Sequence, residues 1–453
     1  MTKSTKILVP SGVLGLGFSE DALIQGLKRQ PDIISIDGGS TDSGPFYLGM
    51  GVSKYSLEVC EAEWHLLMQA RHDNKIPLVI GSCGTCGVNA GVDMMFDMTV
   101  RIAKKLGHSV KIARIYCERE RSEFQIALSE NRIKPLEPAP QITQDSLSKT
   151  THIVSSAGVE PIQKAMEAGA DVILVGRATD TALIAALPLL NNAHKGASWH
   201  AAKIAECGAF CSTNPSSGVI FVEVDETGFM IEAMAQNALC TPETVAAHML
   251  YENADPFILL EPGGHLDVTD ATYTALDARR VRVEGSHWHS SDTYTVKLEA
   301  AKLSGYQTTL LTIVREPNYV AHIDDWIEKL SRICNTKIKQ SMTNSKSTHS
   351  IDFRVIGKNA VLGELEFSES LAPELGVLVI VTADSQGEAD DIAMLINPYL
   401  LHLPLSEDEP IPTTAFAYSP ANSSRGAFFE FALNHIMKLE KPCDGFPLII
   451  DEV

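Results

Sequence analysis

Residues 77–93 have the sequence PLVIGSCGTCGVNAGVD. The apolar run 77–81 predicts a short buried strand, and residues 92–106, whose apolar side chains recur at helical spacing, predict a helix. The glycine-rich loop between them would aim free backbone N–H groups and a helix N-terminus at an anion. A strand, a glycine loop and a helix in this order indicate an α/β fold with ligand contacts at the carboxyl ends of the strands.

The same succession of strand and helix repeats along the first half of the chain. Strands are predicted at residues 6–10, 32–37, 77–81, 110–116, 152–155, 171–176 and 218–224. Helices are predicted at residues 19–29, 58–73, 92–106, 122–131, 161–168 and 180–189. Most of these strands are apolar without alternation, as expected for a parallel sheet that is covered on both faces. We therefore predict a mostly parallel, Rossmann-like α/β domain over residues 1–284, with an open sheet and a closed barrel both compatible with the pattern.

The pattern changes near residue 285. Strands of alternating or mixed character are predicted at residues 293–299, 308–315, 350–355 and 376–383, and helices at 323–334 and 388–395. Such strands combined with two helices predict an α+β domain of ferredoxin-like type over residues 285–453. The polar segment 339–349 predicts a loop, and residues 427–434 predict a short helix-like stretch.

The composition is that of an ordinary globular protein, with 45% hydrophobic and 21% charged residues among 453. The 37 basic and 57 acidic residues give a net charge of −20, which argues against a nucleic acid or an anionic membrane as partner. Nine unevenly spaced cysteines do not suggest a disulfide framework, and no apolar stretch approaches the ~20 residues that span a bilayer. We expect a cytoplasmic protein with reduced thiols, whose small anionic substrate would be held by local positive charge.

Carboxylates and an arginine mark two of the glycine-punctuated stretches. Asp37 ends a predicted strand and Asp42 follows it, where they would act as acid/base groups, bind a metal or cap a turn. In the stretch 168–180, Arg177 comes just after a buried strand, where a guanidinium can bind a carboxylate or phosphate. A structural pair between Arg177 and Asp180 explains the same residues.

Cysteines mark the other two stretches. Cys83 and Cys86 form a C-x-x-C pair in the glycine loop, and Cys207 and Cys211 form a C-x-x-x-C pair further along the chain. These thiols would hold zinc, take part in redox chemistry, or pack as small buried hydrophobes, which is the common case. Glu206, next to Cys207, is either a general base or the end of a helix with a glycine stop.

Taken together, these stretches resemble the acyclic terpene utilisation (AtuA) family. The similarity keeps its order over nearly the whole chain and is carried by residues 77–93, 168–183 (AGADVILVGRATDTAL), 205–208 (AECG), 241–256 (TPETVAAHMLYENADP), 293–297 (TYTVK) and 416–435 (FAYSPANSSRGAFFEFALNH). Proteins of this family are found with terpene and small-acid catabolism. The resemblance therefore implies an acidic substrate, either a free di- or tricarboxylate or an acyl-CoA thioester. Because the family often has small residues in place of Cys83 and Cys86, it argues against a required role for these thiols.

The resemblance also lends weight to a set of candidate site residues. The acid/base candidates are Asp37, Glu206 and Lys297. The substrate-binding candidates are Ser82, Cys83, Gly84, Asn89, Asp93, Arg177, Asp180, Arg425 and Asn434. No resident metal is predicted, and the cofactor is left open, with CoA expected only as part of the substrate.

The candidates are expected to play different roles. Arg177 and the loop from Ser82 to Asn89 would bind an anion. Lys297 would be a buried base, an anion partner or an exposed strand lysine. Two further candidates flank the predicted helix 427–434 and would complete a site between domains; they are Arg425 and Asn434.

The residues and the resemblance together favour an enzyme of lyase or isomerase type. It would act on a small carboxylic acid or its acyl-CoA thioester by hydration or dehydration, double-bond isomerisation or C–C cleavage, through a carbanion- or enolate-like intermediate. One alternative is a non-catalytic ligand-binding or scaffold subunit that needs a partner protein. Another is a zinc- or redox-dependent protein that uses Cys83 and Cys86. A homo-oligomer is expected from the common symmetry of soluble enzymes.

Overall fold

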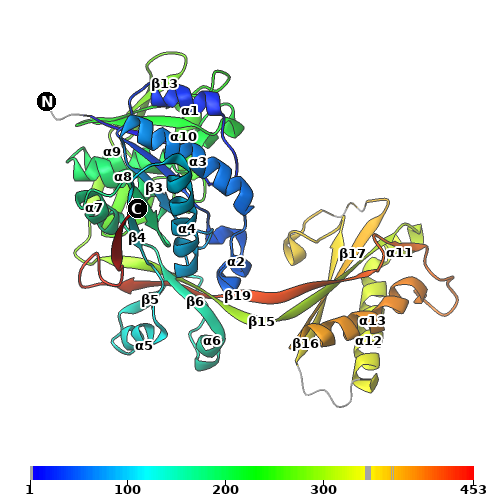
Figure 1. Cartoon of the computed structure of the whole chain (residues 1–453). Coiled ribbons are helices and arrows are strands. Elements are labelled where there is room, and N and C mark those ends of the chain that lie inside the picture. The colour runs from blue at the N-terminus through cyan, green and yellow to red at the C-terminus, as the bar shows by residue number, and fades with distance from the viewer. Residues whose placement is uncertain (1–3, 342–347, 369, 371) are drawn as a thin grey trace. The chain divides into compact units, whose positions relative to one another are not determined.

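The computed structural model of the chain describes residues 4–341, 348–368, 370 and 372–453 (Figure 1). The chain divides into two compact units. Unit 1 comprises Met1–Ala301 and Phe431–Val453, and unit 2 comprises Lys302–Glu430. The second unit is therefore an insertion within the first.

This division differs from the boundary that the sequence suggested at residue 285. Strand β15 (Thr295–Val314) begins in unit 1 and ends in unit 2, so one long strand takes the place of the two predicted at 293–299 and 308–315. The chain later returns to unit 1, where its last strand β20 (Leu448–Glu452) pairs with β4 (Lys111–Ile115). Such a return depends on pairing between distant segments, which a change of pattern along the chain does not reveal.

The main sheet of unit 1 has the strand order β12-β13-β9-β8-β1-β2-β3-β7-β4-β20. Its other strands are β1 (Thr5–Val9), β2 (Ile33–Asp37), β3 (Leu78–Gly81), β7 (Val172–Val175), β8 (Ile220–Val224), β9 (Gly228–Ala233), β12 (Thr272–Ala275) and β13 (Arg280–Glu284). Strands β1, β2, β3, β7 and β4 are parallel neighbours, as the buried apolar runs predicted.

The flanks of this sheet are antiparallel. Strand β8 pairs antiparallel with both β1 and β9, and the run continues through β13 to β12. The connection from Val224 to Gly228 is far too short for the crossover that a parallel pair needs. The α/β class is confirmed, whereas the prediction of a mostly parallel sheet is wrong for these flanking strands.

Helices lie between the strands of unit 1, and several of them, such as α7 and α8, pack on the main sheet (Figure 1). They are α1 (Glu20–Leu27), α2 (Pro45–Met50), α3 (Leu57–Asn74), α4 (Asn89–Leu106), α5 (Arg121–Ser129), α6 (Gln144–Lys149), α7 (Val159–Glu167), α8 (Asp180–Leu190), α9 (Lys195–Ala205) and α10 (Pro242–Ala247). Helix α9 was not predicted, because it is buried over its whole length and so lacks the apolar stripe of a surface helix.

Smaller strands complete unit 1. A three-stranded antiparallel sheet consists of β10 (Ile258–Glu261), β11 (Gly264–Asp267) and β14 (His287–Ser290). Strand β6 (Thr150–Ser155) pairs with β15. Strand β5 (Ile133–Pro135) pairs with the end of β19 that belongs to unit 1.

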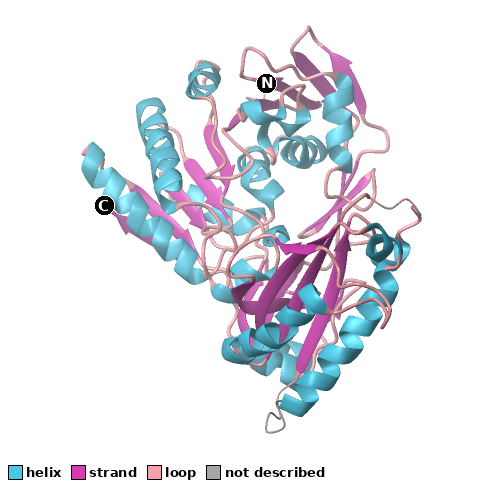
Figure 2. Cartoon of the chain, turned by 90° about the vertical axis from the view of Figure 1, so that its right-hand side faces the viewer, coloured by secondary structure: helices cyan, strands magenta, loops and turns pink. Residues whose placement is uncertain are grey.

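Unit 2 is an antiparallel sheet with helices against it (Figure 2). After β15 the chain forms α11 (Pro317–Ala321), α12 (Ile323–Ser341), β16 (His349–Ile356), β17 (Leu375–Ala383), α13 (Gln386–His402), β18 (Thr414–Phe416) and β19 (Asn422–Lys438). Helices α12 and α13 pack on one another, and α13 packs on β17. The core between them is apolar and includes Trp326 and Tyr319, both fully buried.

Two segments in the second half of the chain differ from their predicted structure. The helix predicted at 427–434 is wrong, because these residues lie within β19, a neighbour of β15 in the sheet. A short apolar run fits a strand or a helix equally well until its pairing partner is known. The predicted loop 339–349 overlaps the end of α12, and its residues 342–347 lie outside the described part of the chain.

The long helices carry charged side chains. Helices α3, α4 and α12 have 18, 18 and 19 residues, and each includes acidic and basic residues along its length. Within the described residues, no helix combines the length and the apolar character that crossing a membrane requires.

Replacement of Gly91 by alanine is expected to destabilise unit 1. Gly91 lies in the first turn of α4, where a Cβ atom would meet the carbonyl oxygen of Cys83 at 2.3 Å. The free energy of unfolding should therefore fall by about 1–3 kcal/mol, opposite to the usual gain from glycine to alanine in a helix. Gly387, at the start of α13, faces open space, so Gly387→Ala should be neutral or stabilising. Thermal denaturation compares the variants, and a wild-type Tm for Gly91→Ala would contradict this packing.

Candidate functional site

Charged and polar side chains gather at the carboxyl ends of the parallel strands of unit 1. Asp37 ends β2, Ser82 follows β3, and Arg177 follows β7. Because these strands are neighbours in the sheet, their loops meet at one edge. The first part of β15 contributes two more charges. We call this group the central cluster; it consists of Asp37, Ser82, Arg177, Asp180, Lys297 and Glu299.

Arg177 lies at the centre of this cluster. Its Nε donates to Glu299 Oε2 at 2.7 Å, and its Nη1 donates to Ser82 Oγ at 3.0 Å. Nη1 also donates to the carbonyl oxygen of Ala178 and lies 3.7 Å from Asp180 Oδ1. Two guanidinium nitrogens are thus engaged, whereas Nη2 donates to no residue in the described part of the chain. Nη2 is the nitrogen left for a ligand oxygen.

Glu299 balances the charge of two cations. Its Oε1 accepts a hydrogen bond from Thr41 Oγ1 at 2.9 Å and lies 3.0 Å from Lys297 Nζ. Burial acts to raise the pKa of Glu299, but Arg177 and Lys297 outweigh burial and hold that pKa at about 2. Glu299 is therefore an ionised carboxylate that positions cations. Lys297 is 44% exposed along its side chain, so its ammonium is accessible to a ligand from solvent.

Asp37 is a buried carboxyl group with one unengaged oxygen. Its Oδ2 accepts the backbone N–H of Gly39 at 3.1 Å, while Oδ1 is buried and has no hydrogen-bond partner among the described residues. Burial, and after it the charge of Asp180, raise the pKa of Asp37 well above its usual value, against the lowering effect of Arg177. The protonated form of Asp37 is therefore favoured more than in an ordinary aspartic acid, and Oδ1 is the oxygen left to exchange a proton.

Asp180 is the more accessible of the two carboxyl groups. It is the first residue of α8, and its side chain is 32% exposed. Burial raises the pKa of Asp180, and Arg177 offsets part of that rise. Two carboxyl groups in such different surroundings favour a state in which Asp37 carries the proton and Asp180 is ionised.

A second group of charged side chains adjoins the central cluster. Lys203, near the end of α9, donates from Nζ to Glu206 Oε1 at 2.5 Å. Burial raises the pKa of Glu206, with Lys203 opposing that rise and Asp180 adding to it. Glu261, at the end of β10, accepts from Thr181 Oγ1 at 2.5 Å, and burial raises its pKa to about 7. Glu206 also forms the C-cap of α9, as expected for the end of a helix, and its role as a general base stays a prediction.

The glycines of the loop after β3 allow two loops to touch. Gly84 and Gly87 have φ angles of +67° and +69°, in the left-handed region that favours glycine. A Cβ atom at Gly87 would meet the backbone nitrogen of Arg177 at 2.2 Å. This close approach of the loops after β3 and β7 sets Ser82 beside the guanidinium.

The anion at the start of α4 is supplied by the chain itself. The backbone N–H of Asn89 donates to Glu118 Oε2 at 2.7 Å, and Glu118 Oε1 lies 2.7 Å from Nδ1 of His152. Burial acts to raise the pKa of Glu118, but His152 and the Asn89 N–H outweigh it and lower that pKa. The helix N-terminus that the sequence assigned to a substrate anion is therefore occupied by Glu118.

Two other candidates have partners outside the central cluster. Asp93 is 53% exposed on α4 and pairs with Arg114. Asn434 uses its amide to donate to the carbonyl oxygens of Leu136 and Pro138, which fixes β19 in unit 1. Arg425 is exposed on the part of β19 that belongs to unit 2, and its predicted role in a site between domains stays a prediction.

The thiols do not gather as a four-cysteine metal site would require. All nine cysteines are free, and Cys83 and Cys86 are fully buried in the glycine loop. Cys211 neighbours Cys240. Among the described residues, no group of metal ligands contains two cysteines, so a zinc site that joins Cys83, Cys86, Cys207 and Cys211 is not formed. A redox role of Cys83 and Cys86 stays a prediction.

Sequence reasoning missed several residues that the geometry makes central. Glu299 follows Lys297 by two positions in a strand, so both side chains share one face. Lys203 precedes Glu206 by three positions in a helix, which also sets them side by side. Both spacings can be read from the sequence and predict that the side chains of each pair lie close together. Glu261 and His248, in contrast, lie near Glu206 only because distant segments of the chain fold together.

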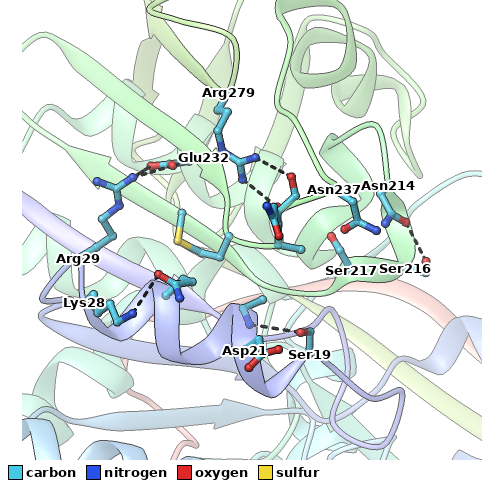
Figure 3. A pocket seen from close by; sticks show the side chains of 15 residues that line it. Ser19, Asp21, Lys28, Arg29, Asn214, Ser216, Ser217, Glu232, Asn237 and Arg279 are labelled. Carbon is cyan, nitrogen blue, oxygen red and sulfur yellow. Dashed lines mark hydrogen bonds and ion pairs between the residues drawn. The ribbon is translucent and has the colours of Figure 1, made fainter.

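A separate cavity of about 1170 Å³ lies between α1 and the segments near β9 and β13 (Figure 3). Its arginines are already engaged: Arg29 donates to the carboxylate of Glu232, and Arg279 donates to the carbonyl oxygens of Ala233 and Ala235. These bonds hold the walls of the cavity together. The raised pKa values of the buried carboxyl groups Asp37 and Asp180 make the central cluster the better candidate for chemistry.

The fold and the central cluster define an α/β protein with buried acidic and basic groups at the carboxyl edge of its parallel strands. The family model of acyclic terpene utilisation family protein AtuA matches residues 65–407, so the chain belongs to the AtuA family. The matched range includes Ser82, Arg177, Asp180 and Lys297 but not Asp37. No curated protein and no solved structure matches this chain.

Replacement of Glu299 by glutamine is expected to destabilise unit 1 at neutral pH. The variant would leave Arg177 buried without its counter-charge, which costs on the order of 3 kcal/mol. The pKa of Glu299 in the folded chain, about 2, lies below its usual value of 4.5. Its contribution to stability is therefore full above about pH 4.5 and is lost as the pH falls toward 2.

Urea denaturation of wild type and Glu299→Gln over a pH series measures this difference. The gap in free energy of unfolding should narrow as the pH falls from 5 toward 3, because the Glu299 carboxylate of the unfolded wild-type chain takes up a proton there while that of the folded chain stays ionised. Glu61 forms an exposed pair with Arg101, so Glu61→Gln should change stability little at any pH. A gap for Glu299→Gln that stays constant with pH would refute the ionised pair.

Proposed function

We propose that this AtuA-family protein is an enzyme of lyase or isomerase type that acts on a small carboxylic acid or its acyl-CoA thioester. The observation that carries the proposal is the pairing of Asp37 with Asp180 beside Arg177. One carboxyl group that keeps its proton and another that is ionised are the two groups needed to move protons on carbon. The cation between them suits the negative charge that develops on the substrate.

In the proposed reaction, ionised Asp180 takes the proton from the carbon next to the substrate's carboxylate or thioester carbonyl. The electron pair of that C–H bond passes into an enolate-like system, which Arg177 Nη2 and Lys297 stabilise. Asp37 then gives its proton to a leaving hydroxyl, which departs as water, or to the far carbon of a shifted double bond. Asp180 has gained one proton and Asp37 has lost one, and exchange with water restores both groups.

The charges that face solvent favour an anionic substrate. Lys297 and Asp180 are the partly exposed members of the central cluster, at 44% and 32% of their side chains. The ammonium of Lys297 would meet the substrate's own carboxylate, while Asp180 meets the C–H bond. A net charge of −20 repels anions at long range, so local cations must supply the attraction.

Finer features of the predicted fold and setting belong to the same proposal. We infer that unit 2 is ferredoxin-like, since β15, α12, β16, β17, α13 and β19 follow the β-α-β-β-α-β order of that fold. The parallel strands of unit 1 support a Rossmann-like core. The free cysteines support a cytoplasmic location, where thiols stay reduced. A homo-oligomer remains a prediction from size and common symmetry.

Separate roles for the two carboxyl groups can be tested by proton NMR in D₂O, with pooled small carboxylates and acyl-CoA esters. Wild type should convert one compound and wash deuterium into one carbon. Asp180→Asn should lose both exchange and product, by roughly 10²–10⁴-fold, because the base is gone. Asp37→Asn should lose product formation by a similar factor but keep the exchange of the α-proton.

Asp32 provides a matched control, since it lies just before β2, at the end of the strand opposite Asp37. It accepts the backbone N–H of Lys6, which asparagine can also do, so Asp32→Asn should keep full activity. A wild-type chain that broadens the lines of one compound but never converts or exchanges it would overturn the enzyme proposal. That outcome would favour the non-catalytic subunit that needs a partner protein.

A further inference from the structure

A second site is marked by three potential metal ligands of different chemistry. A carboxylate oxygen of Glu206, the sulfur of Cys207 and a ring nitrogen of His248 all lie within 4.8 Å of one another. Among the described residues, this is the group of at least three such side chains that stands close enough to share one ion. The proposed reaction of the central cluster uses none of them.

His248 gives an independent sign that this site binds something. Its side chain is almost fully buried, with 5% of the residue exposed, and its Nε2 has no hydrogen-bond partner among the described residues. The ring is held in place by stacking on Tyr251, with centroids 5.4 Å apart and planes 11° from parallel. A buried imidazole nitrogen without a partner loses its hydration and gains no hydrogen bond in return, which is unfavourable. Coordination of an ion would satisfy such a nitrogen.

The position of the three groups is fixed by separate parts of the fold. Glu206 caps the C-terminus of α9, and Cys207 follows it directly. The backbone there is confined, because a Cβ atom at Gly12 would meet Cα of Cys207 at 3.0 Å. His248 comes from the short helix after α10. Three ligands held by rigid elements form a site that needs little rearrangement on binding.

The donor set selects the kind of ion. Thiolate, imidazole and carboxylate together suit Zn²⁺ and similar borderline transition metals, whereas Mg²⁺ and Ca²⁺ prefer oxygen ligands. In a tetrahedral zinc site, ligand atoms lie roughly 3.3–3.6 Å apart, so side-chain shifts on the order of 1 Å would close the group onto an ion. Three protein ligands leave a fourth position open, which is the pattern of catalytic zinc sites.

The neighbouring charges are compatible with a divalent cation. Lys203 engages Glu206 Oε1, which leaves the second oxygen of that carboxylate for an ion and fixes its orientation. Asp180 and Glu261 both act electrostatically on Glu206, so further negative charge surrounds the site. Glu261 also has a buried oxygen, Oε2, without a partner among the described residues. The negative charges of Asp180 and Glu261 offset the positive charge of the Lys203 ammonium.

We propose that Glu206, Cys207 and His248 bind one divalent transition-metal ion of the Zn²⁺ class per chain. The site is separate from the Asp37–Arg177 pair, and its occupation can be measured without any turnover. Failure of the metal proposal and failure of the proposed acid/base chemistry can therefore be told apart.

The test uses Co²⁺ as a spectroscopic probe of the full-length, tag-free chain after treatment with a chelator. Co²⁺ should bind at one equivalent and give the intense thiolate-to-cobalt charge-transfer band that marks a sulfur ligand. Cys207→Ser should abolish that band, and His248→Gln should weaken Co²⁺ binding at least tenfold. Added Zn²⁺ should displace Co²⁺ and raise the Tm of wild type, because an ion that binds only the folded chain stabilises it.

Cys443 offers a matched control, since it is the other cysteine of intermediate exposure and belongs to no ligand group among the described residues. Cys443→Ser should keep the charge-transfer band and the Zn²⁺-dependent rise in Tm. Circular dichroism checks that each variant is folded. If Cys207→Ser is not folded, Glu206→Gln takes its place in the test of metal binding. Wild type without a charge-transfer band, or a band that survives in folded Cys207→Ser, would overturn the proposal.

Discussion

The buried ion pair between Arg177 and Glu299 is the interaction on which the site depends. A guanidinium that is 10% exposed must have a counter-charge, because an unpaired buried charge costs several kcal/mol. That counter-charge comes from β15, 122 positions later in the chain. The pair thus ties the loop after β7 to the strand that also carries Lys297. With Nε and Nη1 engaged, Arg177 presents Nη2 in a fixed direction. Its charge also opposes the rise that burial causes in the pKa values of Asp37 and Asp180.

The parallel centre of the sheet explains why these groups meet at all. Strands β2, β3 and β7 are consecutive in the sheet although long segments separate them in the chain. Their carboxyl ends bring Asp37, Ser82 and Arg177 to one edge. The close approach at Gly87 then removes the space that a side chain would fill between two of these loops. Local geometry and sheet order therefore act together to place Ser82 against the guanidinium.

The sequence predicted what is encoded locally and missed what depends on distant pairing. The strand, loop and helix around residues 77–106 form as predicted, since apolar runs and helical spacing determine them within a few residues. The contact between Arg177 and Asp180 was also within reach, at a separation of three residues. Glu299 was not, because its role depends on an arginine far away in the chain. The strand at 427–434 was mistaken for a helix for the same reason, as its pairing with β15 is non-local.

The balance of charge in unit 1 connects the two proposed sites. Carboxyl groups outnumber cations around Arg177: the acids are Asp37, Asp180, Glu206, Glu261 and Glu299, and the cations are Arg177, Lys203 and Lys297. Crowded buried carboxylates cannot all stay ionised without compensation. A proton would provide it at Asp37, where Oδ1 lacks a partner among the described residues, and a divalent ion would provide it beside His248, where Nε2 also lacks one there. Asp180 acts electrostatically on both Asp37 and Glu206, so the charge state of one site should influence the other. An ion bound at Glu206 would lower the negative potential at Asp180 and favour its ionised form, the state that the proposed proton abstraction requires.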